Sequence, residues 1–160
     1  MRPGANDTGC REAAEHIVSM TREEMLALLE RRVSGWQDRD AEALAADYAE
    51  TAVLDSPMTG KAVGREAIRR AYEAFFEAYG ELSIAPEHVL VDGDQMVSIF
   101  KFSGTHTGTL FGMKGTGKQI VFRGVTVYTV ANGQIVYERR IYDFTGFLMK
   151  LGVITARPSG

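Results

Sequence analysis

The first clear pattern in this chain of 160 residues is a series of apolar side chains at helical spacing. Thr21 and Glu24 stand three residues apart at its start, which is the spacing of a capping box that closes a helix N-terminus. Apolar residues then recur every three or four positions, which predicts one buried face. They are Met25, Leu28, Leu29, Val33 and Trp36.

Two further helices follow, separated by short extended or irregular segments. Asp40 can cap a helix over 41–48, and the β-branched run 51–54 predicts a brief strand that ends at Asp55-Ser56-Pro57. Residues 60–64 are predicted as a loop. A third amphipathic helix is predicted over 65–79, with Gly80 as its stop.

After Gly80 the apolar period changes from helical to alternating, which is typical of strands. Four successive strands are predicted over 83–91, 95–106, 118–130 and 134–144, with turn signals at 92–94 and 131–133. Helices first and long strands last predict an α+β fold, with three N-terminal helices packed on one face of a curved antiparallel sheet.

Alternation along the last strand defines two faces. One face carries Tyr137, Arg139 and Asp143, whereas the other carries Glu138 and Arg140. Both faces carry apolar as well as charged side chains. Because Glu138 and Arg140 suit solvent or a partner surface better, the Asp143 face is expected to point inward, unless a bulge reverses the register.

Composition narrows the class of protein. The length suits a single domain over 20–152, with a loose leader at 1–19 that includes one expected helical turn near 12–17, and a tail at 153–160. A net charge of −3 without charge runs argues against nucleic-acid and membrane partners. The single cysteine, Cys10, excludes an internal disulfide, and the lack of a signal-peptide pattern predicts a cytoplasmic protein.

Asp143 is the first candidate for chemistry, since it lies among Tyr142, Phe144 and Phe147 at the end of the last strand. A carboxylate in apolar surroundings has a raised pKa and can act as a general acid or base. The alternative is a structural aspartate that caps the turn at Thr145 or pairs with a neighbouring arginine.

His106 lies between glycines in Gly104-Thr105-His106-Thr107-Gly108, where it could stabilise an oxyanion or be a structural histidine. Asp55 is a second acid/base candidate or an ordinary turn residue. The three histidines lack ligand spacing, so no metal is expected. The segment 112–118 has the spacing of a phosphate loop, but Gln119 replaces Ser or Thr and a strand follows, so it is predicted as a hairpin loop.

Taken in order, several short segments resemble the SnoaL-like branch of the nuclear transport factor 2-like superfamily. The resemblance covers about residues 21–152 and is carried by Trp36 with 38–40, then by the segments 56–60, 64–68, 104–108, 116–118, 142–143 and 151–152. It implies a cone: three helices wrapped on a strongly curved sheet around an apolar cavity, usually in a homodimer formed through the sheet. It also implies that no metal or organic cofactor is used.

In SnoaL-like polyketide cyclases the aspartate matching Asp143 is the general acid/base of an aldol closure, and the histidine matching His106 shares its pocket. The resemblance therefore assigns Asp143 and His106 as catalytic residues acting on a hydrophobic, polyketide-like carbonyl ligand. Eight residues are expected to bind the substrate, although helical spacing also suits core positions for the first two. They are Trp36, Tyr48, Asp55, Met58, Phe100, Phe122, Arg139 and Phe147.

Three functions stay open on this scaffold. The first is a cyclase or related lyase or isomerase, although Ser56 stands where ketosteroid isomerases place their base. The second is a hydrolase or dehydratase, in which Asp55, Tyr48 or Arg139 would orient water. The third is a non-catalytic module that binds a small molecule. An arginine facing the cavity would favour an anionic or enolate-bearing ligand.

Overall fold

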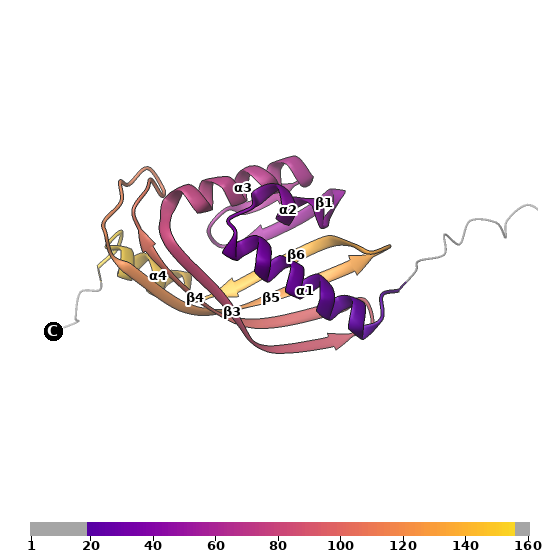
Figure 1. Ribbon diagram of the computed structural model, residues 1–160. Coiled ribbons are helices and arrows are strands. Elements are labelled where there is room, and N and C mark those ends of the chain that lie inside the picture. The colour runs from indigo at the N-terminus through magenta and orange to yellow at the C-terminus, as the bar shows by residue number, and fades with distance from the viewer. Residues whose placement is uncertain (1–18, 156–160) are drawn as a thin grey trace, which may run out of the picture.

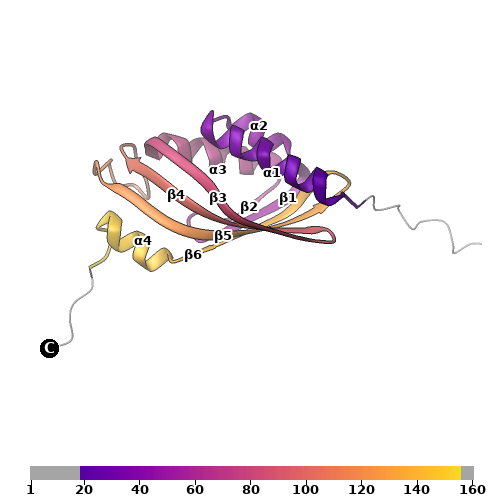
Figure 2. The same cartoon turned by 60° about the horizontal axis from the view of Figure 1, so that its bottom comes forward.

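The computed structural model describes residues 19–155, which form helices on one face of a single curved sheet (Figure 1). Helices α1 (Arg22–Gln37), α2 (Ala41–Ala46) and α3 (Arg65–Ala78) lie across the sheet, and α4 (Phe144–Leu151) stands apart from them at one end (Figure 2). The predicted leader and tail fall largely outside the described residues, as does the turn expected near 12–17.

The sheet has six strands in the order β2-β1-β6-β5-β4-β3. They are β1 (Tyr48–Ser56), β2 (Gly60–Val63), β3 (Tyr79–Asp92), β4 (Gln95–His106), β5 (Gln119–Ala131) and β6 (Gln134–Tyr142). Neighbouring strands are antiparallel except β1 and β6, which run parallel, so the sheet is mixed rather than wholly antiparallel as predicted.

The N-terminal caps confirm two local predictions. Thr21 accepts a hydrogen bond from the Glu24 amide at 3.2 Å, and the Glu24 carboxylate accepts one from the Thr21 amide at 2.7 Å. Asp40 caps α2 by accepting from the Ala43 amide at 2.9 Å. These contacts satisfy amide groups that a helix start leaves free.

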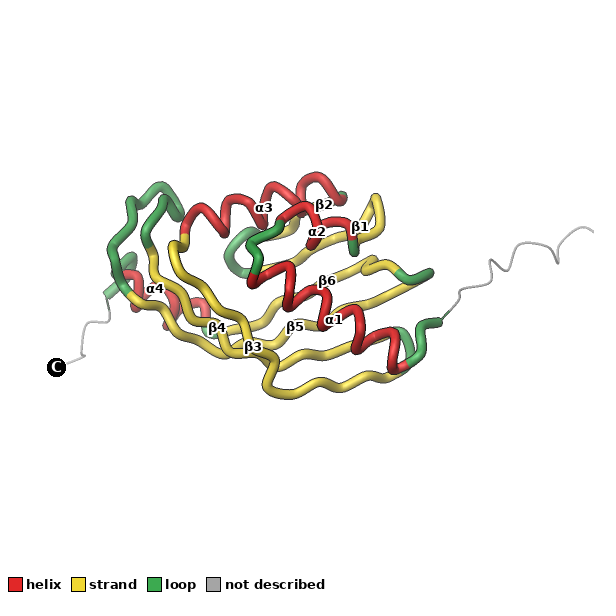
Figure 3. Tube along the Cα trace, in the orientation of Figure 1, coloured by secondary structure: helices red, strands yellow, loops and turns green. Residues whose placement is uncertain are grey.

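Several boundaries differ from the predictions. Helix α2 ends at Ala46, because Tyr48 already begins β1, and the segment 60–63 pairs as β2 instead of forming a loop. Helix α3 passes directly into β3 at Tyr79 without a glycine stop. The segment 112–118 lies in the long loop between β4 and β5, as predicted, at the same end of the molecule as α4 (Figure 3).

The predicted facing of β6 was wrong beyond its first residues. Val130 pairs with Ile135 but Thr129 pairs with Tyr137, so Val136 is an extra residue on β6 and the register shifts there. A bulge of this kind reverses which side chains face inward. Glu138 is therefore fully buried, whereas Arg139 on the opposite face has a 54 % exposed side chain.

Two groups of buried apolar side chains form the interior. The larger joins α1, α2 and α3 to the strands beneath them and includes Leu28, Ile68 and Met96. The smaller gathers under α4, where Phe147 and Leu151 pack with Phe102. Within residues 19–155, none of the helices is long and apolar enough to cross a membrane.

Candidate active site

An aromatic cavity lies between the helices and the inner face of the sheet. Helix α1 contributes Trp36 and helix α3 contributes Tyr72 and Phe75, while Phe100 and Phe122 reach it from β4 and β5. The cavity leaves about 40 Å³ for water-sized occupants. A ring-bearing ligand is larger than this space, so its binding requires aromatic side chains to move apart.

The rings around the cavity form a connected set. Trp36 meets Tyr72 and Phe75 edge to face, with centroids 5.4 and 5.3 Å apart. Phe122 meets Phe100 edge to face at 6.3 Å and lies tilted against Tyr142 at 4.9 Å. Such contacts add to the apolar burial of each ring and give the cavity walls suited to a flat, apolar ligand.

One wall of this cavity is polar and comes from β6. The bulge at Val136 sets the inward facing of β6, and Glu138, Arg140 and Tyr142 all line the cavity. Across the ladder, Glu138 pairs with Tyr128 of β5. Among the described residues, Glu138 supplies the only carboxylate of the cavity wall.

Glu138 is held by three partners. Its Oε1 accepts from Arg140 Nε at 2.5 Å, and its Oε2 accepts from the Tyr48 hydroxyl and lies 3.5 Å from Arg32 Nη2. Burial alone would raise the pKa of Glu138, but Arg140, Arg32 and the Tyr48 hydroxyl outweigh it and hold the pKa below its ordinary value. Glu138 is therefore ionised at neutral pH.

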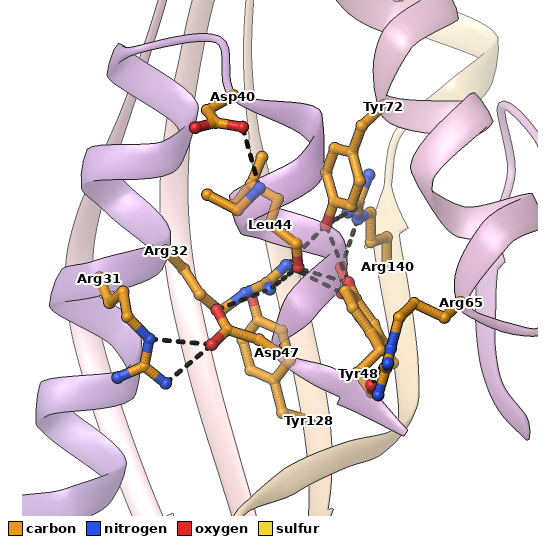
Figure 4. A network of polar contacts seen from close by, with 12 residues as sticks. Arg31, Arg32, Asp40, Leu44, Asp47, Tyr48, Arg65, Tyr72, Tyr128 and Arg140 are labelled. Atoms are coloured by element: carbon orange, nitrogen blue, oxygen red, sulfur yellow. Dashed lines mark hydrogen bonds and ion pairs between the residues drawn. The ribbon is translucent and has the colours of Figure 1, made fainter. Parts of the chain in front are cut away.

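Arg32 of α1 is sealed behind this wall, with a side chain 1 % exposed. Its guanidinium donates to the hydroxyls of Tyr48 at 2.9 Å, Tyr72 at 2.6 Å and Tyr128 at 3.4 Å, as Figure 4 shows. Its Nη1 donates to the Leu44 carbonyl at 3.2 Å. A buried cation needs such partners, since an unpaired one would be costly.

The tyrosine hydroxyls form an ordered chain toward Glu138. Tyr48 has one hydroxyl hydrogen and donates it to Glu138, so Tyr72 is the donor in the 2.8 Å contact between the two hydroxyls. Tyr72 in turn accepts from both Arg32 and Arg140, each at 2.6 Å. The polar wall is thus fixed in one hydrogen-bonding arrangement before any ligand binds.

Arg140 is the cation that faces the cavity, with a side chain 14 % exposed. Its guanidinium lies 5.5 Å from the Trp36 ring centroid and 5.2 Å from that of Tyr72, which is the geometry of a cation–π contact. Burial would lower the pKa of Arg140, but Glu138 and the tyrosine oxygens hold it well above the ordinary value.

Tyr142 supplies a hydroxyl to the same cavity, beside Ser56 of β1. The two oxygens are 3.4 Å apart. Burial raises the pKa of Tyr142 and the Ser56 contact opposes this only in part, so the phenol stays protonated and can donate to an oxygen atom.

The eight predicted substrate-binding residues separate into three groups. Trp36, Met58, Phe100 and Phe122 line the cavity. Tyr48 is fully buried in the polar network, and Phe147 packs behind Phe122 with centroids 5.8 Å apart.

Asp55 and Arg139 form the third group and do not line the cavity. They pair on adjacent strands, where Arg139 Nη2 lies 3.6 Å from Asp55 Oδ2 and the Tyr137 hydroxyl donates to the same oxygen at 3.0 Å. The register shift in β6 places Arg139 on the outer face, which corrects its predicted facing.

Asp143 is exposed and lies outside the cavity wall, in contrast to the apolar surroundings that its neighbours in the sequence suggested. It is the N-cap of α4, where its Oδ1 accepts from the Gly146 amide at 2.8 Å. This contact agrees with the alternative prediction, in which Asp143 caps the turn after the last strand.

His106 is fully buried at the end of β4 but does not line the cavity either. Its Nδ1 lies 3.1 Å from the Thr116 hydroxyl and accepts from the Thr116 amide at 3.3 Å, so His106 joins β4 to the following loop. Burial lowers its pKa. The structure shows no contact between Asp143 and His106 among the described residues.

The sequence reasoning missed the polar wall. Glu138 and Arg140 were assigned to solvent because they are charged, and Arg32 and Tyr128 were not singled out. One signal was present: Arg32 follows the apolar stripe of α1 at four residues from Leu28 and from Trp36. An arginine on such a stripe predicts a buried cation with partners. The described residues contain no group of three or more His, Cys, Asp and Glu side chains suited to a metal ion.

Known structures share this fold at low sequence identity. IdmH from Streptomyces antibioticus, a candidate polyketide cyclase, is 21% identical with a TM-score of 0.67, covering 79% of this chain and 97% of its own. A candidate SnoaL-like polyketide cyclase from Jannaschia sp. CCS1 is 20% identical with a TM-score of 0.75, over 83% and 94%. AclR from Streptomyces galilaeus, a candidate hydroxylase, is 19% identical with a TM-score of 0.74, over 86% and 87%.

No curated protein matches the sequence. The family model described as SnoaL-like polyketide cyclase, however, matches residues 27–151, which is most of the chain. That span runs from α1 to the last residue of α4 and includes every residue of the aromatic cavity and of its polar wall. The chain belongs to the SnoaL-like polyketide cyclase family.

Proposed function

We propose that this protein is an acid/base enzyme that acts on a hydrophobic carbonyl compound in the aromatic cavity. The observation that carries the proposal is the pairing of Glu138 with Arg140 on a cavity wall that is otherwise mostly aromatic. A single carboxylate beside a fixed cation, facing an apolar space, can move a proton and stabilise the charge that forms.

The proposed step is removal of a proton from the carbon next to the carbonyl group. Glu138 takes the proton, and the electron pair of the C–H bond moves into the enolate. The enolate oxygen accepts hydrogen bonds from Arg140 and from Tyr142, both of which line the cavity. The enolate carbon then either attacks a second carbonyl, as in an aldol closure, whose new alkoxide oxygen takes the proton from Glu138, or takes the proton back from Glu138 at another position.

Arg140 and Tyr142, the two donors, must supply much of the stabilisation of the enolate. Because its pKa is held low, the Glu138 carboxylate is a weak base. Removing one donor to a developing oxyanion typically lowers a rate by about 10²–10³. Arg140 is therefore expected to matter as much as the base itself.

The test uses proton exchange of 2-tetralone in D2O, followed by NMR, because this reaction needs only the first step. The wild-type protein should accelerate loss of the protons next to the carbonyl. Arg140→Gln should lower the acceleration by about 10²–10³. No acceleration by the wild-type protein above that of an equal concentration of acetate would contradict the proposal.

Asp143→Asn separates this assignment from the one that the family resemblance implies. Asparagine is also a good N-cap, so the variant should keep α4 intact. If Glu138 is the general base, Asp143→Asn should exchange the protons of 2-tetralone at the wild-type rate. A loss of 10² or more in Asp143→Asn, with Arg140→Gln unaffected, would instead support Asp143 as the general base.

A binding module without chemistry is the second candidate. It is favoured by one observation: Glu138 already accepts from Arg140 and Tyr48 and pairs with Arg32, which suits a carboxylate that orients a cation. Ligand binding without exchange in the same assay would support it.

A further inference from the structure

We infer that the ligand of this cavity carries an oxyanion that binds Arg140, so that its class is a flat, apolar carboxylate or enolate rather than a neutral ketone. The inference rests on the proposed use of this cavity as the ligand site, and it adds the charge of the ligand and the residue that selects it.

The polar wall holds one carboxylate between two guanidinium groups. Glu138 is shared by the guanidinium groups of Arg32 and Arg140. The next acid, Asp47, is paired with Arg31 at 2.7 Å and lies 3.6 Å from Arg32. Arg31 is 58 % exposed, so water solvates its charge. Arg140 shares Glu138 with Arg32 and has no second acid as a partner among the described residues.

Arg140 is the cavity-facing guanidinium group that has donors left for a ligand. Arg32 is 1 % exposed, and its donors are occupied by Tyr48, Tyr72, Tyr128 and the Leu44 carbonyl. Arg140 instead lines the cavity. An arginine has five N–H donors, and the hydrogen bonds found among the described residues use two of those of Arg140, to Glu138 and Tyr72. Three donors remain for a ligand.

Arg140 is also held in a fixed orientation that suits an anion. Its contact with Glu138 and its position over the Trp36 and Tyr72 rings fix the guanidinium plane. A planar guanidinium with free donors binds carboxylates and similar oxyanions through paired hydrogen bonds. In a cavity with mostly aromatic walls this attraction is weakened less by water than at a surface.

The basicity of Glu138 and the donors of Arg140 also narrow the class of substrates for the proposed reaction. A weakly basic carboxylate removes a proton more readily from carbon that is already acidified, as it is between two carbonyl groups. A 1,3-dicarbonyl compound meets this condition, and its enolate has two oxygens that match the fork of Arg140. Such compounds are the class expected to turn over.

The experiment compares benzoate with benzamide, which is a neutral molecule of nearly the same shape. Both are titrated into the 15N-labelled protein at low ionic strength and pH 7, and Kd values are taken from amide shifts around the cavity. The wild-type protein should bind benzoate at least tenfold more tightly than benzamide. Arg140→Gln should bring the two affinities within about threefold of each other.

Arg139→Gln is the matched control, because it removes the same charge from the adjacent residue on the outer face of β6. It should keep the tenfold preference. Arg140→Gln should fold, since Glu138 retains Tyr48 and Arg32 as partners. Three results would overturn the inference: equal affinities of the wild-type protein for benzoate and benzamide, an equal loss of the benzoate preference in both variants, or no binding of either molecule.

The outcome is separable from that of the proposed function. Exchange of 2-tetralone without a preference for benzoate would keep the enzyme and reject the anionic ligand. A preference for benzoate that depends on Arg140, without exchange, would keep the ligand class and reject the chemistry.

Discussion

Replacing Glu138 by glutamine should cost the protein a large part of its stability. The change keeps the shape of the side chain but removes the charge that lies between Arg32 and Arg140. Two guanidinium groups would then be buried with no carboxylate between them. Breaking a buried ion pair from one side typically costs about 3–5 kcal/mol.

The size of the effect follows from the local geometry. A unit charge pair about 4 Å apart at an effective dielectric constant of about 20 interacts by about 4 kcal/mol, so two such partners give about 8 kcal/mol. Glutamine avoids the cost of burying a carboxylate, which is several kcal/mol. The net loss is therefore about 3–5 kcal/mol, a third or more of the stability of an ordinary domain.

The pH dependence has a definite sign. The pKa of Glu138 is held below its ordinary value of 4.5 in the folded state. Its contribution to stability is therefore fully present above that value and is lost as the pH falls through the folded-state pKa. The difference between wild-type and Glu138→Gln should be constant at neutral pH and should shrink under acid conditions below the ordinary value.

Urea unfolding at pH 7 measures the effect. With an m-value of about 2 kcal/mol/M, the midpoint of Glu138→Gln should fall by about 2 M. Glu87→Gln is the control, because Glu87 pairs with Arg123 at 2.8 Å on the surface, where such pairs contribute about 0–1 kcal/mol. If Glu138→Gln costs no more than this control, Glu138 does not hold the two guanidinium groups as described.

Three further predictions concern the fold and the assembly. Thr21→Ala removes the capping box of α1 and should cost about 1 kcal/mol in urea unfolding, and no change would mean that the cap is not formed in solution. Gly108→Ala should cost about 1–3 kcal/mol and lower the Tm, because its Cβ would lie 1.9 Å from the Glu77 carbonyl oxygen; a stable, unshifted variant would show that the close approach is absent. The family resemblance implies a homodimer through the sheet, and Ile141 is 53 % exposed on the outer face of β6. Light scattering should therefore give a dimer for the wild-type protein and a monomer for Ile141→Glu, whereas a monomeric wild-type protein would reject the dimer.

The helices and strands were largely predictable because each depends on local pattern. The capping box at Thr21 and the alternation in 95–106 are properties of neighbouring residues, and both appear where expected. Helix α4 was not predicted, because five apolar residues within an eight-residue segment after a strand do not by themselves distinguish a helix from a loop.

The site was predictable only in part, because its polar wall depends on one extra residue in β6. Strict alternation from Ile135 places Asp143 inward, but the bulge at Val136 turns Glu138 and Arg140 inward instead. Nothing in the local sequence marks Val136 as the bulged residue. The burial of Glu138 also depends on Arg32, which is 106 residues away in the chain.

The most direct test of an anion site at Arg140 is a crystal structure of the protein with bound benzoate. One carboxylate oxygen should lie within about 2.7–3.2 Å of the Arg140 guanidinium, with the ring between Trp36 and Phe122 in the widened cavity. Benzoate bound at Asp143 or His106, with the Arg140 wall unoccupied, would contradict it.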